Sequence, residues 1–210
     1  FELAEKYRTP VFILADGTLG QAMEPVELQF RTPPRLAADW AVTGADGRPP
    51  RVVRSMHLAP EDLEAHNRHL QAKFAEIAAR EVRWAGEHLD GAELVIVAYG
   101  TAARVARTAL ARARADGLRA GLFRPITLWP FPSAALAEAA ASARGVLVVE
   151  LSAGQMVEDV RLAIEGRTPV AFEGRTGGMV PTPREVLGAL RRLRAATSEG
   201  APKPKREARP

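Results

Sequence analysis

Residues 124–132 read RPITLWPFP, and this stretch organises the second half of the chain. Proline fixes φ, lacks a backbone donor and pushes the preceding residue toward extended geometry. Three prolines within nine residues therefore favour neither a helix nor a freely moving loop. We expect the stretch to leave a strand at 120–123 as a stiff, extended arm, which carries two large apolar side chains, Trp129 and Phe131.

On both sides of this arm, apolar runs alternate with helical patterns. The predicted strands cover 93–99, 119–123, 145–150 and 169–174. The predicted helices cover 102–115, 134–143, 155–164 and 183–195. Strands that alternate with helices imply a largely parallel sheet with helices on both faces and right-handed crossovers. The sequence therefore predicts an α/β fold for this half.

Capping residues mark the ends of several predicted helices. Thr101 and Ser133 are predicted N-caps, and the pair at 116–117, Asp-Gly, is predicted to end a helix. The stretch TPRE at 182–185 combines an N-cap threonine, a proline in the first turn and a glutamate three residues after the cap. This combination predicts a capping box.

The first 30 residues have a different character. Residues 1–8 are interpreted as a helix end that Pro10 stops, and VFILA at 11–15 is predicted to be a strand buried on both faces. Asp16 follows this strand, where it either faces a ligand or, as we favour, caps a turn. One helix and one strand do not make a domain. Residues 1–30 are therefore interpreted as the last layer of an α/β domain whose earlier part this sequence lacks.

Residues 31–90 are predicted to form a connector and one long helix. Prolines and glycines punctuate the connector, and Trp40 is its expected anchor. From Pro60 to about Leu89, apolar residues recur at helical spacings, which predicts a helix about 40 Å long. Such a helix is expected to lie across a neighbouring domain or subunit.

Two histidines of this helix, His66 and His69, share a face with Asp62. Two imidazoles and one carboxylate lack a fourth zinc ligand, so a solvated helix face is favoured over a metal site.

The composition excludes several classes of function. The chain has no cysteine, so it has no thiolate for an iron–sulfur cluster, no disulfide and no thiol nucleophile, which fits a reducing cytoplasm. Its longest apolar runs are too short to span a bilayer. Half of the net charge of +4 falls in 197–210, a predicted disordered basic tail, so no basic face indicates nucleic-acid binding.

Glycines and polar residues gather at the predicted carboxyl ends of the strands. The dipeptide at 100–101 offers backbone donors to an anion, but helix capping is the favoured interpretation. The loop RTGGMV at 175–180 could also hold an anion, and a tight turn before the next helix explains it equally well. The predicted sheet unit contains no histidine, cysteine or Ser–His pair. No residue is therefore predicted to be catalytic, cofactor-binding or metal-binding. The same edge instead supplies candidate interface residues: Arg124, Trp129, Phe131, Gly154 and Gln155.

Five stretches are distinctive when taken together: PVFILADGTLGQAMEPVE, VAYGTAARVAR, GLFRPITLWPFP, VVELSAGQMVEDVRLA and GRTGGMVPTPREVL. They resemble the alpha subunit of 2-oxoacid:ferredoxin oxidoreductases, and most nearly the branched-chain 2-oxoisovalerate (3-methyl-2-oxobutanoate) type. The resemblance runs from residue 1 to about residue 195. More remotely, the strand–YG–helix, strand–RP and VVE–G patterns are similar to the C-terminal domain of transketolase and of the pyruvate dehydrogenase beta chain.

The resemblance implies a thiamine diphosphate enzyme that decarboxylates a 2-oxoacid, forms an acyl-CoA and passes electrons to ferredoxin through [4Fe-4S] clusters. It implies that the glutamate which activates the cofactor lies in a pyrimidine-binding part absent from this sequence. It further implies that the thiamine diphosphate–Mg²⁺ half-site and the cluster ligands lie on partner subunits. The expected partners are beta and gamma subunits, with a ferredoxin-like delta subunit as a further candidate, and the expected compartment is the cytoplasm.

The chain is therefore interpreted as a C-terminal fragment of an alpha subunit that is inactive alone and serves subunit assembly. The expected parts are the end of a pyrimidine-binding domain (1–30), the connector and long helix (31–90), a transketolase C-terminal-like domain (91–196) and the tail (197–210). The alternatives are a 2-oxoglutarate-specific alpha subunit, a stand-alone α/β domain that binds a small molecule, and an interaction module.

Overall fold

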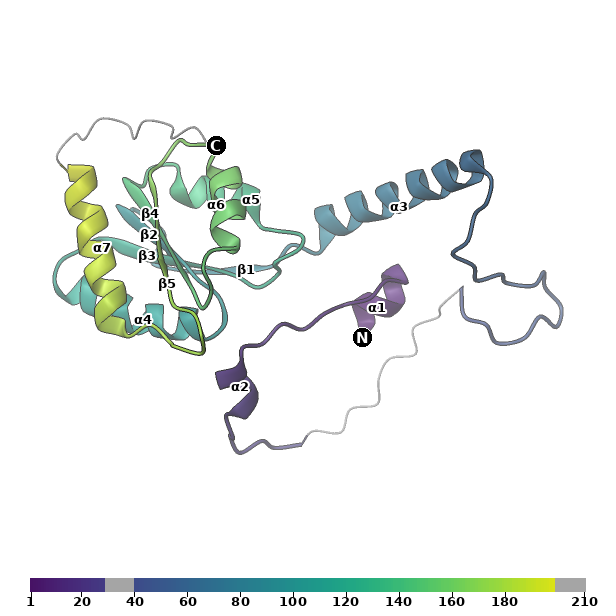
Figure 1. Cartoon of the computed structure of the whole chain (residues 1–210), viewed down its shortest axis with the longest axis horizontal. Helices are drawn as coiled ribbons and strands as arrows, with labels where there is room; N and C mark the ends of the chain where they lie inside the picture. The colour runs from purple at the N-terminus through teal and green to yellow at the C-terminus, as the bar shows by residue number, and fades with distance from the viewer. Residues whose placement is uncertain (29–39, 199–210) are drawn as a thin grey trace. The chain divides into compact units, whose positions relative to one another are not determined.

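The computed structural model describes residues 1–28 and 40–198 of the 210-residue chain, which Figure 1 traces. These residues form two compact units. The first, the N-terminal unit, consists of 1–14 and 23–80. The second, the sheet unit, consists of 15–22 and the chain from Glu81 onward. The sheet unit begins before the predicted boundary at 91 because an additional strand belongs to it.

The sheet unit is built around one sheet, whose strands within the described residues lie in the order β1-β3-β2-β4-β5. The strands are β1 (Trp84–Glu87), β2 (Leu94–Val97), β3 (Ala120–Pro125), β4 (Gly145–Glu150) and β5 (Val170–Gly174). The last four pair in parallel, whereas β1 pairs antiparallel with β3 at one edge. The four predicted strands and their mostly parallel arrangement are therefore confirmed.

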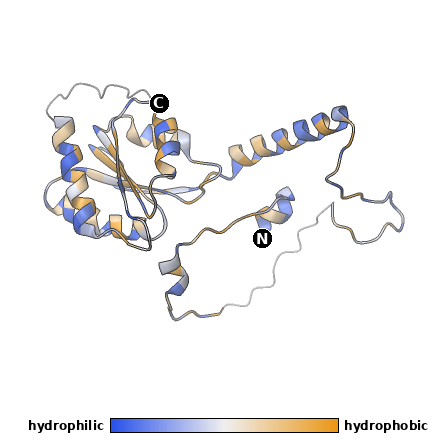
Figure 2. Ribbon diagram, viewed as in Figure 1, coloured by the Kyte–Doolittle hydropathy of each residue, from blue (hydrophilic) through white to orange (hydrophobic). Residues whose placement is uncertain are grey.

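Helices cover both faces of this sheet (Figure 1). One face packs against α4 (Gly100–Ala115) and α7 (Pro183–Ser198), and the other packs against α5 (Ser133–Ala140) and α6 (Met156–Ile164). Side chains alternate between these two cores along β4, so that Leu147 faces the first and Val148 the second. Burial on both faces explains why the central strands β2 and β4 are largely apolar runs. Figure 2 colours apolar stretches of the sheet orange.

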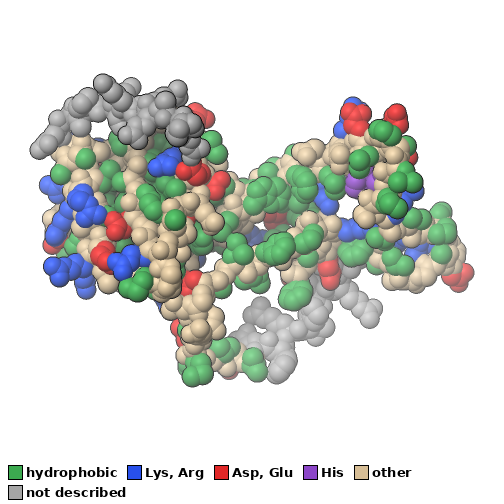
Figure 3. All heavy atoms as spheres, viewed as in Figure 1, with side chains coloured by type: hydrophobic (Ala, Val, Ile, Leu, Met, Phe, Trp, Pro, Cys, Tyr) green, Lys and Arg blue, Asp and Glu red, His purple; other side chains and the backbone are tan. Residues whose placement is uncertain are grey.

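Charged side chains on the α4–α7 side are mixed in sign (Figure 3). Arg191 pairs with Asp116 at 2.5 Å, and Arg192 pairs with Glu173 at 2.9 Å. Among the described residues of this face, arginines therefore lie beside acidic partners.

The long helix is shorter than predicted. It is α3 (Pro60–Arg80) and ends well before Leu89, and the chain then forms β1. The ring of Trp84 stacks on Phe123 of β3, with centroids 4.9 Å apart and planes at 11°. Pairing with β3 and this stacking outweigh the helical spacing of Trp84. Gly86 was the local sign of a break, because glycine disfavours a helix interior.

The ends of two helices confirm the predicted motifs. In the capping box of α7, the Thr182 Oγ1 accepts a hydrogen bond from the Glu185 N–H at 3.2 Å, and Glu185 Oε2 accepts one from the Thr182 N–H at 2.7 Å. Helix α4 ends at Ala115, and the predicted pair follows it, with Asp116 as the C-cap and Gly117 at φ +79°.

The other two predicted caps are wrong. Helix α4 begins at Gly100 with Tyr99 as its N-cap, so Thr101 already lies within the helix. Helix α5 begins at Ser133 itself, with Pro132 as its N-cap. The helix begins two residues earlier than expected at α4 and one residue earlier at α5, and neither N-cap side chain binds the helix end.

The N-terminal unit contains α1 (Glu2–Tyr7) and α3, but a small core. Tyr7 and Ile77 are the large apolar side chains that are buried among its described residues. Trp40 is the predicted anchor of the connector: its Nε1–H donates to the Glu5 carbonyl at 2.9 Å, and the Arg8 guanidinium lies 5.7 Å from its ring centroid.

The strand predicted at 11–15 is absent. Residues 11–14 are extended but pair with no strand in the described part of the chain, and the side chain of Ile13 is 93% exposed. A strand requires a neighbour whose backbone satisfies its polar groups, and none of the described residues of this unit supplies one. The origin of residues 1–30 in a pyrimidine-binding domain stays a prediction.

Two further predictions concern the histidines and the tail. The rings of His66 and His69 lie 6.5 Å apart, and His57 stacks on His66 at 4.6 Å. Within 1–28 and 40–198, no group of histidine and acidic side chains is arranged to hold a metal ion. Helix α7 continues through Ser198, and the rest of the predicted basic tail lies outside the described residues.

Candidate functional site

The carboxyl ends of β2, β3 and β4 meet at one edge of the sheet, which we call the carboxyl edge. In α/β sheets this edge is where ligand sites and interfaces usually form. The segments that follow the strands there are 98–101, 126–132 and 151–155. The short helix α2 (Gly17–Gln21), with its N-cap Asp16, also lies at this edge.

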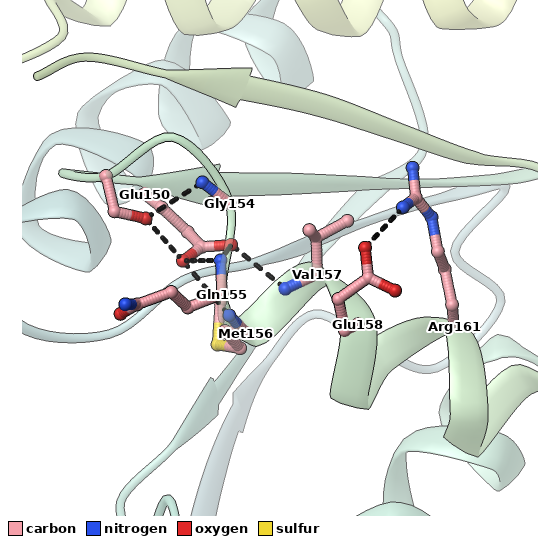
Figure 4. A network of polar contacts seen from close by, with 8 residues as sticks. Glu150, Gly154, Gln155, Met156, Val157, Glu158 and Arg161 are labelled. Atoms are coloured by element: carbon pink, nitrogen blue, oxygen red, sulfur yellow. Dashed lines mark hydrogen bonds and ion pairs between the residues drawn. The ribbon is translucent and has the colours of Figure 1, made fainter. Parts of the chain in front are cut away.

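Glu150, the last residue of β4, is 98% buried, and its carboxylate closes the N-terminus of α6 (Figure 4). It accepts hydrogen bonds from the backbone N–H groups of Gln155 at 3.1 Å, Met156 at 3.1 Å and Val157 at 2.9 Å. The Ser152 hydroxyl donates to it at 3.0 Å. The first N–H groups of a helix have no partner within the helix, and the Glu150 carboxylate accepts their hydrogen bonds. Its negative charge also interacts favourably with the positive end of the helix dipole. This carboxylate is therefore the N-terminal cap of α6.

The loop between β4 and α6 is fixed by its backbone. Gly154 adopts φ +110°, and its N–H donates to Ser152 Oγ at 3.1 Å. A Cβ at this glycine would lie 3.1 Å from a methyl group of Val157, so both conformation and space require glycine. Of the candidate interface residues here, Gly154 shapes the loop, and Gln155 contributes its backbone N–H to Glu150.

Asp16 confirms the favoured prediction of a cap and adds a contact that the sequence did not reveal. Its Oδ1 accepts a hydrogen bond from the Leu19 N–H at 2.8 Å, which caps α2. Its Oδ2 accepts one from the Thr101 N–H at 3.4 Å, in the first turn of α4. Hydrogen bonding with Thr101 is the main cause that holds the pKa of Asp16 below its ordinary value.

The two carboxylates make this part of the carboxyl edge electronegative. Burial raises the pKa of the Tyr99 hydroxyl, and the negative charges of Glu150 and Asp16 raise it further. Burial likewise raises the pKa of Asp159, with smaller contributions from Glu150 and Glu158. An incoming phosphate would have to displace an internal carboxylate at the start of α4 and of α6. At these two helix N-termini, carboxylates of the chain itself occupy the position that a bound anion would take.

The RPITLWPFP arm does not project freely, because hydrogen bonds hold its first half against the segment before β1. The Ile126 and Thr127 N–H groups donate to the Arg83 carbonyl at 2.9 and 3.1 Å, and the Arg83 N–H donates to Thr127 Oγ1 at 3.0 Å. The Trp129–Pro130 peptide bond is cis. Phe131 is half-buried against the core formed with α5 and α6, whereas Trp129 is 61% exposed. Of the two expected apolar anchors, Trp129 therefore faces solvent and Phe131 belongs to the core.

Arg124 is the penultimate residue of β3, lies at the same edge and is half-buried. Its Nε is fully buried, and its side chain has no hydrogen-bond or ion-pair partner in the described part of the chain. The sequence had marked Arg124 as an interface candidate but could not show this lack of a partner.

Together, the strand order and the helices on both faces define a three-layer α/β module, as predicted. A solved 2-oxoglutarate:ferredoxin oxidoreductase from Magnetococcus marinus, with 2-oxoglutarate, coenzyme A and succinyl-CoA bound, has a similar fold. The TM-score is 0.54 with 22% sequence identity, over 66% of this chain and 24% of that chain. At this identity the likeness concerns the fold.

Sequence comparisons are more specific. Residues 92–186 match the family model of the pyruvate:ferredoxin oxidoreductase core domain II. The ketoisovalerate oxidoreductase subunit VorB of Methanothermobacter marburgensis is 42% identical over 200 residues, which cover 95% of this chain and 56% of VorB. The 2-oxoglutarate synthase subunit KorA of the same organism is 30% identical over 217 residues, covering 90% of this chain and 58% of KorA.

The chain thus belongs to the family of 2-oxoacid:ferredoxin oxidoreductase subunits that its motifs resemble. It spans a little over half the length of these relatives. No helix in 1–28 or 40–198 combines the length and apolar character needed to cross a membrane.

Proposed function

We propose that this chain is part of the alpha subunit of a branched-chain 2-oxoacid:ferredoxin oxidoreductase of the cytoplasm. The complex would decarboxylate the oxoacid, form its acyl-CoA and reduce ferredoxin. The observation that carries this proposal is the 42% identity to a ketoisovalerate oxidoreductase subunit across 95% of the chain. The 30% identity to a 2-oxoglutarate synthase subunit makes 2-oxoglutarate the second candidate substrate.

Within that complex, the role proposed for this chain is assembly. Its carboxyl edge, the usual ligand position of such a sheet, is occupied by Glu150 and Asp16. Two carboxylates at the helix N-termini do not fit the diphosphate of thiamine diphosphate, and a chain without cysteine does not fit cluster ligation through thiolates. These observations support the placement of thiamine diphosphate, Mg²⁺ and the [4Fe-4S] clusters on beta, gamma and delta partner subunits.

Two measurements test the proposal. Titration calorimetry of the isolated chain with thiamine diphosphate and Mg²⁺ should show no saturable binding, and 2-oxoisovalerate should not drive ferredoxin reduction. Turnover by the isolated chain would overturn the assembly role. Saturable binding of a nucleotide or CoA would instead favour a stand-alone binding domain.

The second measurement uses the complex purified with its partner subunits. Its kcat/KM for 2-oxoisovalerate should exceed that for 2-oxoglutarate. The opposite order would assign the chain to the 2-oxoglutarate type and leave the assembly role intact.

A further inference from the structure

Arg124 differs from its neighbouring arginines in lacking a partner. Arg107 forms a hydrogen-bonded ion pair with Glu87, and Arg119, just before the start of β3, forms one with Glu93. Both of these arginines are more than half exposed. Arg124 is less exposed, its Nε is fully buried, and none of the described residues pairs with its side chain.

An unpartnered buried N–H of this kind is costly. Leaving a buried donor unsatisfied costs about 1–3 kcal/mol, and more when the group is charged. The positive charge of Arg124 makes a minor contribution to lowering the pKa of the Glu87 carboxylate. That carboxylate is, however, already hydrogen-bonded to Arg107, the main cause of its lowered pKa. The terminal amino groups of the Arg124 guanidinium are not among the buried atoms, so a carboxylate from a partner subunit can pair with them even though the Nε itself stays covered.

Exposed apolar side chains surround the end of β3. Trp84, opposite Pro125 in the β1–β3 pair, is 42% exposed, and Ile126 is 50% exposed. Trp129 follows in the same loop and is the most exposed of the three. We call Trp84, Arg124, Ile126 and Trp129 the β3-end surface. Tryptophan and arginine are the residues that most often dominate protein–protein binding energies.

The register shows how a partner must approach this surface. Side chains alternate along β3, so Arg124 leaves the sheet on the face opposite to Phe123, the residue that Trp84 covers. The guanidinium and the Trp84 ring therefore lie on opposite faces of the sheet, next to its edge strand β1. A partner that contacts both must pass across the end of this edge.

We propose that the β3-end surface docks a segment of a partner subunit that presents an aspartate or glutamate carboxylate to Arg124 and apolar side chains to Trp84, Ile126 and Trp129. The inference rests on the proposed function, because it requires a multi-subunit enzyme. Charge complementarity supports this occupant, since the guanidinium fork matches a carboxylate in a bidentate arrangement. The occupant is a polypeptide rather than a substrate.

The substitution Arg124→Met separates docking from folding. It removes a charge that the chain alone leaves unpaired, so the melting temperature of the isolated chain should stay the same or rise. The dissociation constant for the purified partner subunits, measured by analytical ultracentrifugation, should rise about tenfold or more, as expected for loss of one partner of a buried charge pair. Arg124→Lys should restore only part of the affinity, because lysine lacks the fork.

Arg119→Met is the matched control, because Arg119 lies near the other end of the same strand and is exposed in an ion pair. It should leave the affinity unchanged. Wild-type affinity should fall as NaCl is raised, and Arg124→Met should reduce this salt dependence.

Three outcomes would overturn the inference. Arg124→Met could lower the melting temperature of the chain and leave assembly unchanged, which would make Arg124 a structural residue. The isolated chain could form dimers that this substitution breaks, which would assign the surface to a second copy. Finally, the wild-type chain could form no complex with beta and gamma subunits. This third outcome would refute the proposed function as well, whereas the first two would refute only the docking inference.

Discussion

The two units use similar residue types in opposite ways. In the sheet unit, strands β2 and β4 are buried along their whole length between helices. In the N-terminal unit, the comparable run at 11–14 is exposed, and Tyr7 and Ile77 are the large apolar side chains buried among its described residues. The comparison teaches that an apolar run forms a strand only where the same unit supplies its neighbours. The sheet unit supplies them and the N-terminal unit does not.

The largest expected effect of this difference is in amide hydrogen exchange. Amides of β4 should exchange only through global unfolding, whereas those of residues 11–14 should exchange through local opening. For a unit stable by about 5–6 kcal/mol, this corresponds to a difference in protection of about 10⁴-fold. Exchange measured by NMR or mass spectrometry on the isolated chain checks it. Equal protection of 11–14 and β4 would erase the distinction between the units.

The next largest effect is expected from the buried carboxylate of the sheet unit. Glu150→Ala leaves three backbone N–H groups of α6 without their acceptor, and should lower the free energy of unfolding by about 3–5 kcal/mol. Glu158→Ala is the control on the same helix, because Glu158 is exposed and pairs only with Arg161 in the described chain. It should cost less than about 0.5 kcal/mol. Urea unfolding of both variants gives the comparison, and similar values would show that Glu150 is not a structural cap.

A smaller effect is expected from close packing beside β3. A Cβ at Gly121 would lie 2.6 Å from the His88 carbonyl oxygen, which is backbone and cannot move aside as a side chain would. Gly121→Ala should therefore cost about 1–3 kcal/mol. Gly20→Ala is the control, since a Cβ there meets nothing within 4 Å and α2 favours alanine over glycine. A Gly121→Ala chain as stable as the wild type would contradict the packing described here.

The smallest effect concerns pH. The pKa of Asp16 in the folded chain lies below its ordinary value of 3.8. Its contribution to stability is therefore present above about pH 4 and is lost as the pH falls through the folded pKa. The NMR chemical shift of the Thr101 amide should change with pH, with a midpoint below 3.8. In the Asp16→Asn variant this pH-dependent change should disappear. A midpoint at or above 3.8 would show that the Asp16–Thr101 contact does not form in solution.

The sequence predicted the features that leave a local pattern and missed those that depend on tertiary contacts. The four parallel strands were predictable because their burial on both faces leaves continuous apolar runs, and the capping box of α7 was predictable because its residues are close in sequence. The strand β1 was missed because Trp84 fits the helical spacing of α3, and its contact with Phe123 is tertiary. The strand at 11–15 was wrongly predicted because composition alone does not distinguish a buried run from an exposed one.

The candidate site shows the same limit. Arg124, Trp129 and Gly154 could be selected because they cluster at the predicted strand ends. The cap formed by Glu150 could not be predicted, because it depends on the loop at 151–154 returning the chain to the end of β4. The contact between Asp16 and Thr101 joins residues far apart in the sequence and had no local indication. The interface roles of Arg124, Trp129, Phe131, Gly154 and Gln155 stay predictions.

The central claim is that the sheet unit contributes assembly rather than chemistry, and Trp129→Ala tests it most directly. The measurement is the assembled fraction of the complex and its 2-oxoacid-dependent ferredoxin reduction, recorded together over a range of protein concentrations. We expect the concentration for half-assembly to rise about tenfold, as for loss of a tryptophan hot spot, with turnover falling only in proportion to the assembled fraction. Unchanged assembly combined with reduced turnover would contradict the claim.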